Sequence, residues 1–80
     1  MNKVEFLRWL TSLGIYDENL PYHNTCDPIR GYWCYRDDCE GERIIIYNSE
    51  MTSSIAVYLN EDFEKNVHLC IPEVRNLLGI

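Results

Sequence analysis

The chain has 80 residues, of which 46% are hydrophobic and 25% charged, and its net charge is −6. This length allows one domain spanning residues 1–80 and leaves no room for a second core. The composition excludes intrinsic disorder, and the acidic balance without a basic stripe argues against direct binding to nucleic acid or to an anionic membrane.

The first predicted element is a helix over residues 3–13. Its apolar face is made by four residues at helical spacing: Phe6, Trp9, Leu10 and Leu13. Asn2 can cap the first turn, and Glu5 follows three residues later, which is the spacing of a capping box. Gly14 comes directly after the last apolar position and favours a helix stop there.

From residue 31 onward the hydrophobic period changes to two, which indicates strands. Three strands are predicted, at residues 32–36, 42–47 and 53–59, with a hairpin loop at 37–41. The second strand carries apolar side chains on both faces, Ile44 with Ile46 and Ile45 with Tyr47. Because both faces are apolar, we place this strand at the centre of an antiparallel meander.

The remaining segments complete an α+β fold. Residues 16–30 are predicted to be irregular, and residues 60–66 to be a turn or a single helical turn. Residues 67–71 alternate like a short fourth strand, and Pro72 suits the first position of a short C-terminal helix. The predicted fold is therefore an N-terminal helix, a three- to four-stranded antiparallel meander sheet and a short C-terminal helix.

One face of this sheet has little predicted structure to cover it. The side chains expected there are Trp33, Tyr35, Ile45, Tyr47 and either Tyr58 or Ala56. An exposed aromatic patch of this kind is typical of an interface. The alternative is that the loop at 16–30 folds across the patch, and the strand register decides between the two.

A cluster of cysteine and histidine offers a candidate metal site. Its residues are His23, Cys26, Cys34 and Cys39, with His68 and Cys70 as alternatives for the fourth ligand. Four such ligands could hold a structural zinc ion, although neither pair has the tight Cys-x-x-Cys spacing. Disulfides are the second interpretation, and free thiols that pack as small apolar residues are the third. No cofactor other than zinc is expected.

The N-terminal residues lack the uninterrupted apolar segment of a signal peptide, so the expected location is the cytoplasm, where thiols stay reduced. We find no catalytic residues: the sequence has no phosphate-binding loop, no zinc-protease motif and no recognised nucleophile motif. The chain is therefore not expected to be an enzyme.

We expect a small acidic protein-binding module whose partner is another protein with a basic surface. One form would be an inhibitor, of the kind that phages and other mobile elements encode, that blocks a nucleic-acid-binding surface of a host protein. The predicted partner-binding residues are Tyr32, Trp33, Tyr35, Asp37, Asp38, Glu40, Glu42 and Tyr47. A zinc-stabilised small adaptor domain is the alternative function, and a homodimer through the bare sheet face is an alternative assembly.

Overall fold

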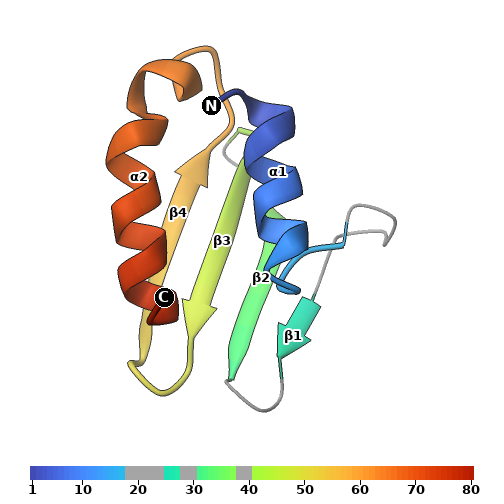
Figure 1. Ribbon diagram of the computed structural model, residues 1–80, viewed down its shortest axis with the longest axis vertical. Helices are drawn as coiled ribbons and strands as arrows, with labels where there is room; N and C mark the ends of the chain where they lie inside the picture. The colour runs from blue at the N-terminus through green and yellow to red at the C-terminus, as the bar shows by residue number, and fades with distance from the viewer. Residues whose placement is uncertain (18–24, 28–30, 38–40) are drawn as a thin grey trace.

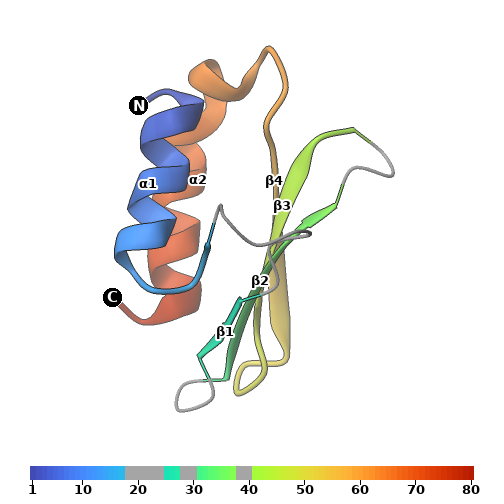
Figure 2. The same ribbon diagram turned by 90° about the vertical axis from the view of Figure 1, so that its right-hand side faces the viewer.

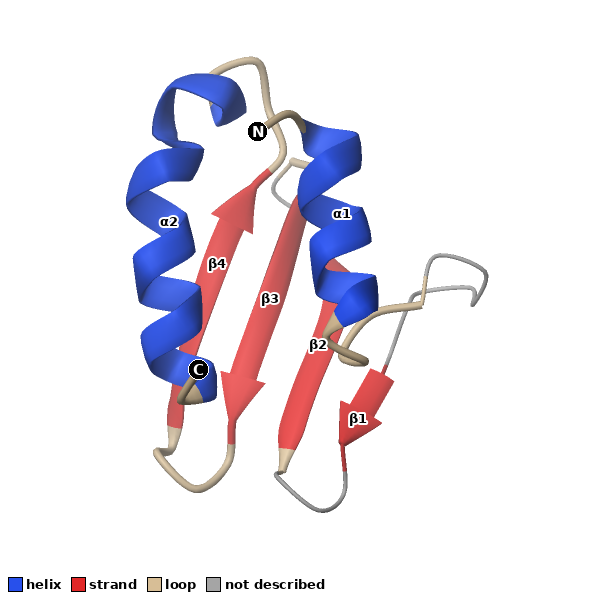
Figure 3. Cartoon of the chain, viewed as in Figure 1, coloured by secondary structure: helices blue, strands red, loops and turns tan. Residues whose placement is uncertain are grey.

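The computed structural model describes residues 1–17, 25–27, 31–37 and 41–80, which form an α+β fold of two layers (Figures 1 and 3). Both helices lie on the same side of one antiparallel sheet (Figure 2). In chain order the elements are α1 (Lys3–Ser12), β1 (Thr25–Asp27), β2 (Tyr32–Asp37), β3 (Arg43–Asn48), β4 (Ser53–Tyr58) and α2 (Phe63–Leu78).

The three long strands β2, β3 and β4 form the predicted antiparallel meander, with β3 in the middle. The short β1 adds three backbone pairs at the outer edge of β2, inside a region that the sequence predicted to be irregular. The strand order is therefore β1-β2-β3-β4. The central position of β3 confirms the inference from its two apolar faces.

Helix α1 begins and ends as the sequence predicts. The side chain of Asn2 accepts a hydrogen bond from the Glu5 N–H at 2.9 Å, and the Glu5 carboxylate accepts one from the Asn2 N–H at 3.4 Å. After the helix, Gly14 takes a φ of +77°, and the Ile15 N–H donates to the Leu10 carbonyl at 3.4 Å. These bonds satisfy backbone groups that the two helix ends would otherwise leave unpaired.

The predicted strand at 67–71 and the short helix beginning at Pro72 are wrong, because both segments belong to the single helix α2. Leu69, which would alternate in a strand, is 60% exposed. The buried side of the helix consists of residues at helical spacing, namely Phe63, Val67, Val74, Leu77 and Leu78. Pro72 has no N–H to donate to the His68 carbonyl one turn earlier. Both residues lie on the exposed side, so water can donate to that carbonyl instead.

The hydrophobic core fills the space between the sheet and the two helices. Phe6 of α1 packs edge-on against Phe63 of α2, with ring centroids 5.3 Å apart. Beneath them lie the fully buried Ile44 and Ile46 of β3. Burying these side chains supplies most of the favourable free energy of folding in a domain this small.

Two polar side chains of the sheet hold the last turn of α2. The Asn48 amide donates to the Leu77 carbonyl at 2.7 Å, and its oxygen accepts from the Glu50 N–H at 2.9 Å. The hydroxyl of Tyr32 donates to the Leu78 carbonyl. Carbonyls at a helix C-terminus have no partner within the helix, so these bonds both satisfy them and fix the helix to the sheet.

Candidate protein-binding face

The face of the sheet opposite the helices is formed by nine residues of β2, β3 and β4 (Figure 2). The strand register places them in three rows of directly opposed residues. The rows are Trp33–Tyr47–Ser54, Tyr35–Ile45–Ala56 and Asp37–Arg43–Tyr58. We call these nine residues the open face.

Three aromatic side chains of the open face are substantially exposed. Trp33 is 47% exposed, Tyr35 38% and Tyr58 43%. Their neighbours in β2, Tyr32 and Cys34, point to the opposite side and are buried. The exposure therefore follows the strict alternation of the strand, and it places the aromatic side chains on a hydrogen-bonded scaffold.

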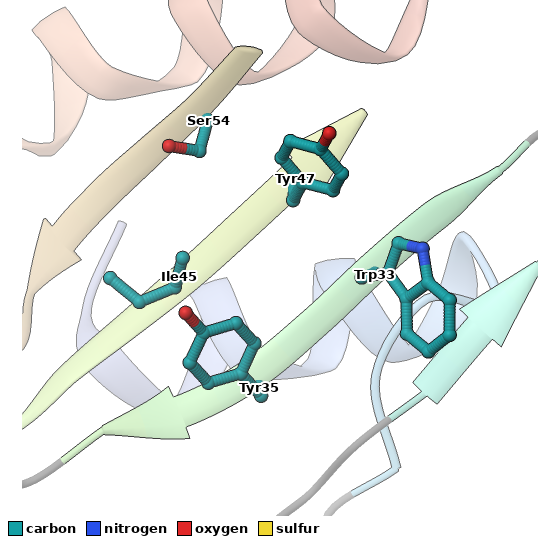
Figure 4. Close-up of a pocket in the computed structure, with 5 residues that line it drawn as sticks. All are labelled: Trp33, Tyr35, Ile45, Tyr47 and Ser54. Atoms are coloured by element: carbon teal, nitrogen blue, oxygen red, sulfur yellow. The ribbon is translucent and has the colours of Figure 1, made fainter. Parts of the chain in front are cut away.

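An open hollow lies among the apolar side chains of this face (Figure 4). In the described part of the chain, its lining comprises Trp33, Tyr35, Ile45, Tyr47 and Ser54. The aromatic rings and the isoleucine make it apolar, while two phenol hydroxyls and the indole N–H remain available as hydrogen-bond groups. This combination suits a protein surface better than a water-filled site for a charged small molecule.

The Asp37–Arg43–Tyr58 row, at one end of the open face, is held together by an ion pair and a hydrogen bond. The guanidinium of Arg43 lies 2.5 Å from the Asp37 carboxylate and 3.2 Å from the Tyr58 hydroxyl. The same guanidinium stands 5.7 Å from the centre of the Tyr58 ring. The hydrogen bond to Asp37, followed by that to Tyr58, raises the pKa of Arg43. This end of the face therefore carries compensated charge.

Glu42, another predicted partner-binding acid, lies on the helix side of the sheet. Its carboxylate lies 2.8 Å from the Lys3 ammonium of α1 and also pairs with Arg36. The hydrogen bond from Lys3, together with the positive charge of Arg36, lowers the pKa of Glu42. Asp37 and Glu42 are therefore neutralised within the chain, whereas Asp38 and Glu40 lie outside the described residues.

The predicted partner-binding residues separate into two groups in the structure. Trp33, Tyr35 and Tyr47 share the open face, but Tyr32 faces the core and is 8% exposed. Tyr32 is adjacent in sequence to the aromatic residues of the open face, but side chains of a strand alternate between its two faces, which separates Tyr32 from them. Arg43 was missed, although its place across the hairpin from Asp37 follows once the register is set.

The predicted metal ligands are only partly described. His23 and Cys39 lie outside the described residues, and Cys26 belongs to β1. Cys34 is buried in the core, where burial raises the pKa of its thiol to about 12. Within residues 1–17, 25–27, 31–37 and 41–80, no three potential ligands come together. The zinc site stays a prediction.

The alternative ligands His68 and Cys70 do not share one side of an element. Two residues apart on a strand they would point the same way, but on a helix that spacing turns the side chains through about 200°. Both residues lie in α2, so they diverge. Burial, and then the charge of Glu73, raise the pKa of the Cys70 thiol.

Comparisons with protein-family models, with curated proteins and with solved structures found no match to this chain. Neither helix in the described part of the chain is long and apolar enough to cross a bilayer. The function is therefore inferred from the surface of the molecule itself.

Proposed function

We propose that this chain is a protein-binding module and that its open face docks onto a partner protein with a basic surface. The observation that carries the proposal is the group of exposed aromatic side chains, Trp33, Tyr35 and Tyr58, on one flat face. Tryptophan and tyrosine are enriched among the residues that dominate binding energy at protein interfaces. An apolar patch rimmed by polar groups is also the usual anatomy of such an interface.

The scaffold beneath these side chains favours tight binding. β3 is paired along its whole length on both sides, and β2 is paired with β3 across six positions. Each aromatic side chain has only two rotatable bonds, so ordering it on binding costs little entropy. A face that is already ordered loses less freedom when it docks than a loop would.

The charge of the chain indicates the chemistry of the partner. The net charge of −6 produces a long-range field that attracts a basic protein and accelerates encounter. At the contact itself Arg43 is paired with Asp37, so desolvating this row costs less than desolvating an unpaired charge would. One form of this function is an inhibitor that covers the nucleic-acid-binding surface of its partner.

The test compares two variants in capture from a cell extract followed by affinity measurement. Trp33→Ala combined with Tyr35→Ala removes two open-face anchors, whereas Val4→Ala shortens an exposed apolar side chain on α1, in the helix layer. We expect the wild type and Val4→Ala to bind the same basic protein. The double variant should bind it at least about a hundredfold more weakly, since two hot-spot residues contribute about 2 kcal/mol each.

Two further readouts bear on the partner. Raising the ionic strength should slow association, because screening shortens the range of the field. Adding the wild-type chain should displace nucleic acid from the captured partner. The proposal fails if the partner is acidic or if the double variant binds it as well as Val4→Ala does. It also fails if the wild type and Val4→Ala are dimers by native mass while the double variant is a monomer, because the open face would then bind a second copy of the chain.

A further inference from the structure

The outer edge of β4 presents backbone groups that no strand of the described chain pairs. β4 is the last strand in the sheet order. The Leu59 N–H donates to the Glu42 carbonyl at 2.8 Å, and in an antiparallel ladder hydrogen-bonded and non-hydrogen-bonded pairs alternate from there. Ser54, Ala56 and Tyr58 therefore direct their N–H and C=O groups away from β3, toward the edge.

The strand at this edge lacks the sequence features that normally protect edge strands from pairing. The strand Ser53–Tyr58 contains no charged residue, no proline and no glycine. Its six residues pair with β3 in continuous register, without a bulge. Natural proteins usually place lysine, proline or a bulge at an exposed edge, so an unprotected edge is a template for an added strand.

Hollows flank this edge on the side of α2, which runs beside β4 along its length (Figure 1). One hollow has Tyr58, Phe63 and Cys70 in its lining. The other has Met51, Ile55 and Leu77. Each lining combines apolar side chains with polar ones, and the two hollows lie near opposite ends of β4. An added strand would therefore have places for apolar side chains on its helix-facing side.

We propose that an extended segment of a partner protein adds to the sheet along β4, placing alternate apolar side chains in the two hollows and a lysine or arginine beside Glu73. Among the described residues, the charged side chains that line the hollows are Asp62 and Glu73, both acidic. The contact between Asp62 and Lys65 is long, at 3.7 Å, and both side chains are mostly exposed. The edge therefore offers main-chain pairing together with a negative rim.

A second copy of this chain suits the edge less well than a basic segment does. Pairing two β4 strands about a two-fold axis through Ala56 would bring both α2 helices, and both copies of Glu73, to the same junction. Each copy also carries a charge of −6. The inferred site shares strand β4 with the open face but does not depend on Trp33 or Tyr35, since it uses the backbone of β4 and the hollows beside α2.

The test begins with a yeast-displayed library of random nine-residue peptides, selected against the wild-type protein. Ala56→Pro removes an N–H that points outward and leaves the bonds to β3 intact, a substitution that edge strands tolerate. Ala56→Val is its control, because it keeps that N–H. Selected peptides should alternate apolar residues, carry at least one base, and bind Ala56→Pro at least about tenfold more weakly than Ala56→Val.

A pair of charge reversals on α2 gives a readout that does not depend on the proline variant. Glu73→Lys reverses charge in the hollow, whereas Glu64→Lys makes the same change nine residues away, on the opposite side of the helix. Peptide affinity should fall several-fold for Glu73→Lys and stay unchanged for Glu64→Lys. On binding, amide exchange should slow at Ser54, Ala56 and Tyr58.

The inference is overturned if the library yields no binder, if the selected peptides bind Ala56→Pro as well as Ala56→Val, or if wild-type protein alone dimerises through this edge. The selected peptides should bind the Trp33→Ala, Tyr35→Ala double variant normally. If the peptides lost affinity for that variant but not for Ala56→Pro, they would be binding the open face, and the edge site would be excluded.

Discussion

The two faces of the sheet are built from the same strands and differ in what covers them. In β3, Ile44 and Ile46 are fully buried beneath the helices, whereas Ile45 and Tyr47, which alternate with them, remain partly exposed. One face is an ordinary core, and the other presents side chains of the same chemistry to solvent. Adjacent residues of one strand can therefore serve stability and recognition separately, and substitutions on the two faces should have different consequences.

The largest difference in stability between the two faces should appear when adjacent isoleucines of β3 are shortened. Ile44→Ala leaves a cavity in the core and should lower the free energy of unfolding by about 3–4 kcal/mol. Ile45→Ala, on the open face, should cost less than about 1.5 kcal/mol. Urea denaturation measures both values. Equal losses would show that the open face is packed as tightly as the core.

A polar substitution on the covered face should have the next largest effect. Asn48→Ala leaves the Leu77 carbonyl and the Glu50 N–H without their side-chain partner, and should cost about 2–3 kcal/mol. Ser54→Ala, on the open face, should change stability by less than about 0.5 kcal/mol. Thermal unfolding monitored by circular dichroism measures the loss of stability in each variant. A small loss for Asn48→Ala would mean that the end of α2 contributes little.

The glycine before β2 tests what fixes the start of that strand, and hence which of its residues face outward. Gly31 has a φ of +72°, and a Cβ there would lie 2.2 Å from the Ser49 hydroxyl oxygen. Gly31→Ala should therefore cost about 1–2 kcal/mol. Gly14→Ala is the control, since its φ is +77° with nothing within 4 Å of the new Cβ. If Gly31→Ala and Gly14→Ala lowered the stability equally, the positive φ alone, and not the contact with Ser49, would account for the loss.

The smallest expected effect concerns the ion pairs that join α1 to the sheet. The lowered pKa of Glu42 means that its contribution is present above the ordinary carboxyl value of 4.5 and is lost as pH falls through the lowered value. Glu42→Gln should thus cost about 0.5–1 kcal/mol at neutral pH, with the difference from wild type shrinking in acid. Glu61→Gln, an exposed control, should show no such trend. A difference that is constant with pH would exclude the ion pair as its cause.

Local signals in the sequence predicted the parts of the fold that local interactions decide. The capping residues Asn2, Glu5 and Gly14 lie within one helical turn of the ends they fix, and they predicted α1 correctly. The two-sided apolar pattern of β3 predicted its central position. Tertiary packing overrode local preference in α2, since the helical spacing from Phe63 to Val74 continues through Pro72, which the sequence had suggested as a helix start.

The candidate site was predictable only in part, because it depends on register and on contacts between distant residues. Trp33, Tyr35 and Tyr47 were placed together from their alternation alone. The pairing of Lys3 with Glu42 spans 39 positions, and no pattern near either residue indicates it. For this reason the sequence did not indicate that Glu42 is paired with a base in the folded chain.

The positions of the two chain ends have a practical consequence. The N- and C-termini both lie in the helix layer, at opposite ends of that layer (Figures 1 and 2). An affinity tag, a fluorophore or a fused carrier attached at either end would emerge beside the helices and on the far side from Trp33. Immobilising the protein through its termini should therefore leave the aromatic surface accessible, and a label at one end can report on docking without obstructing it.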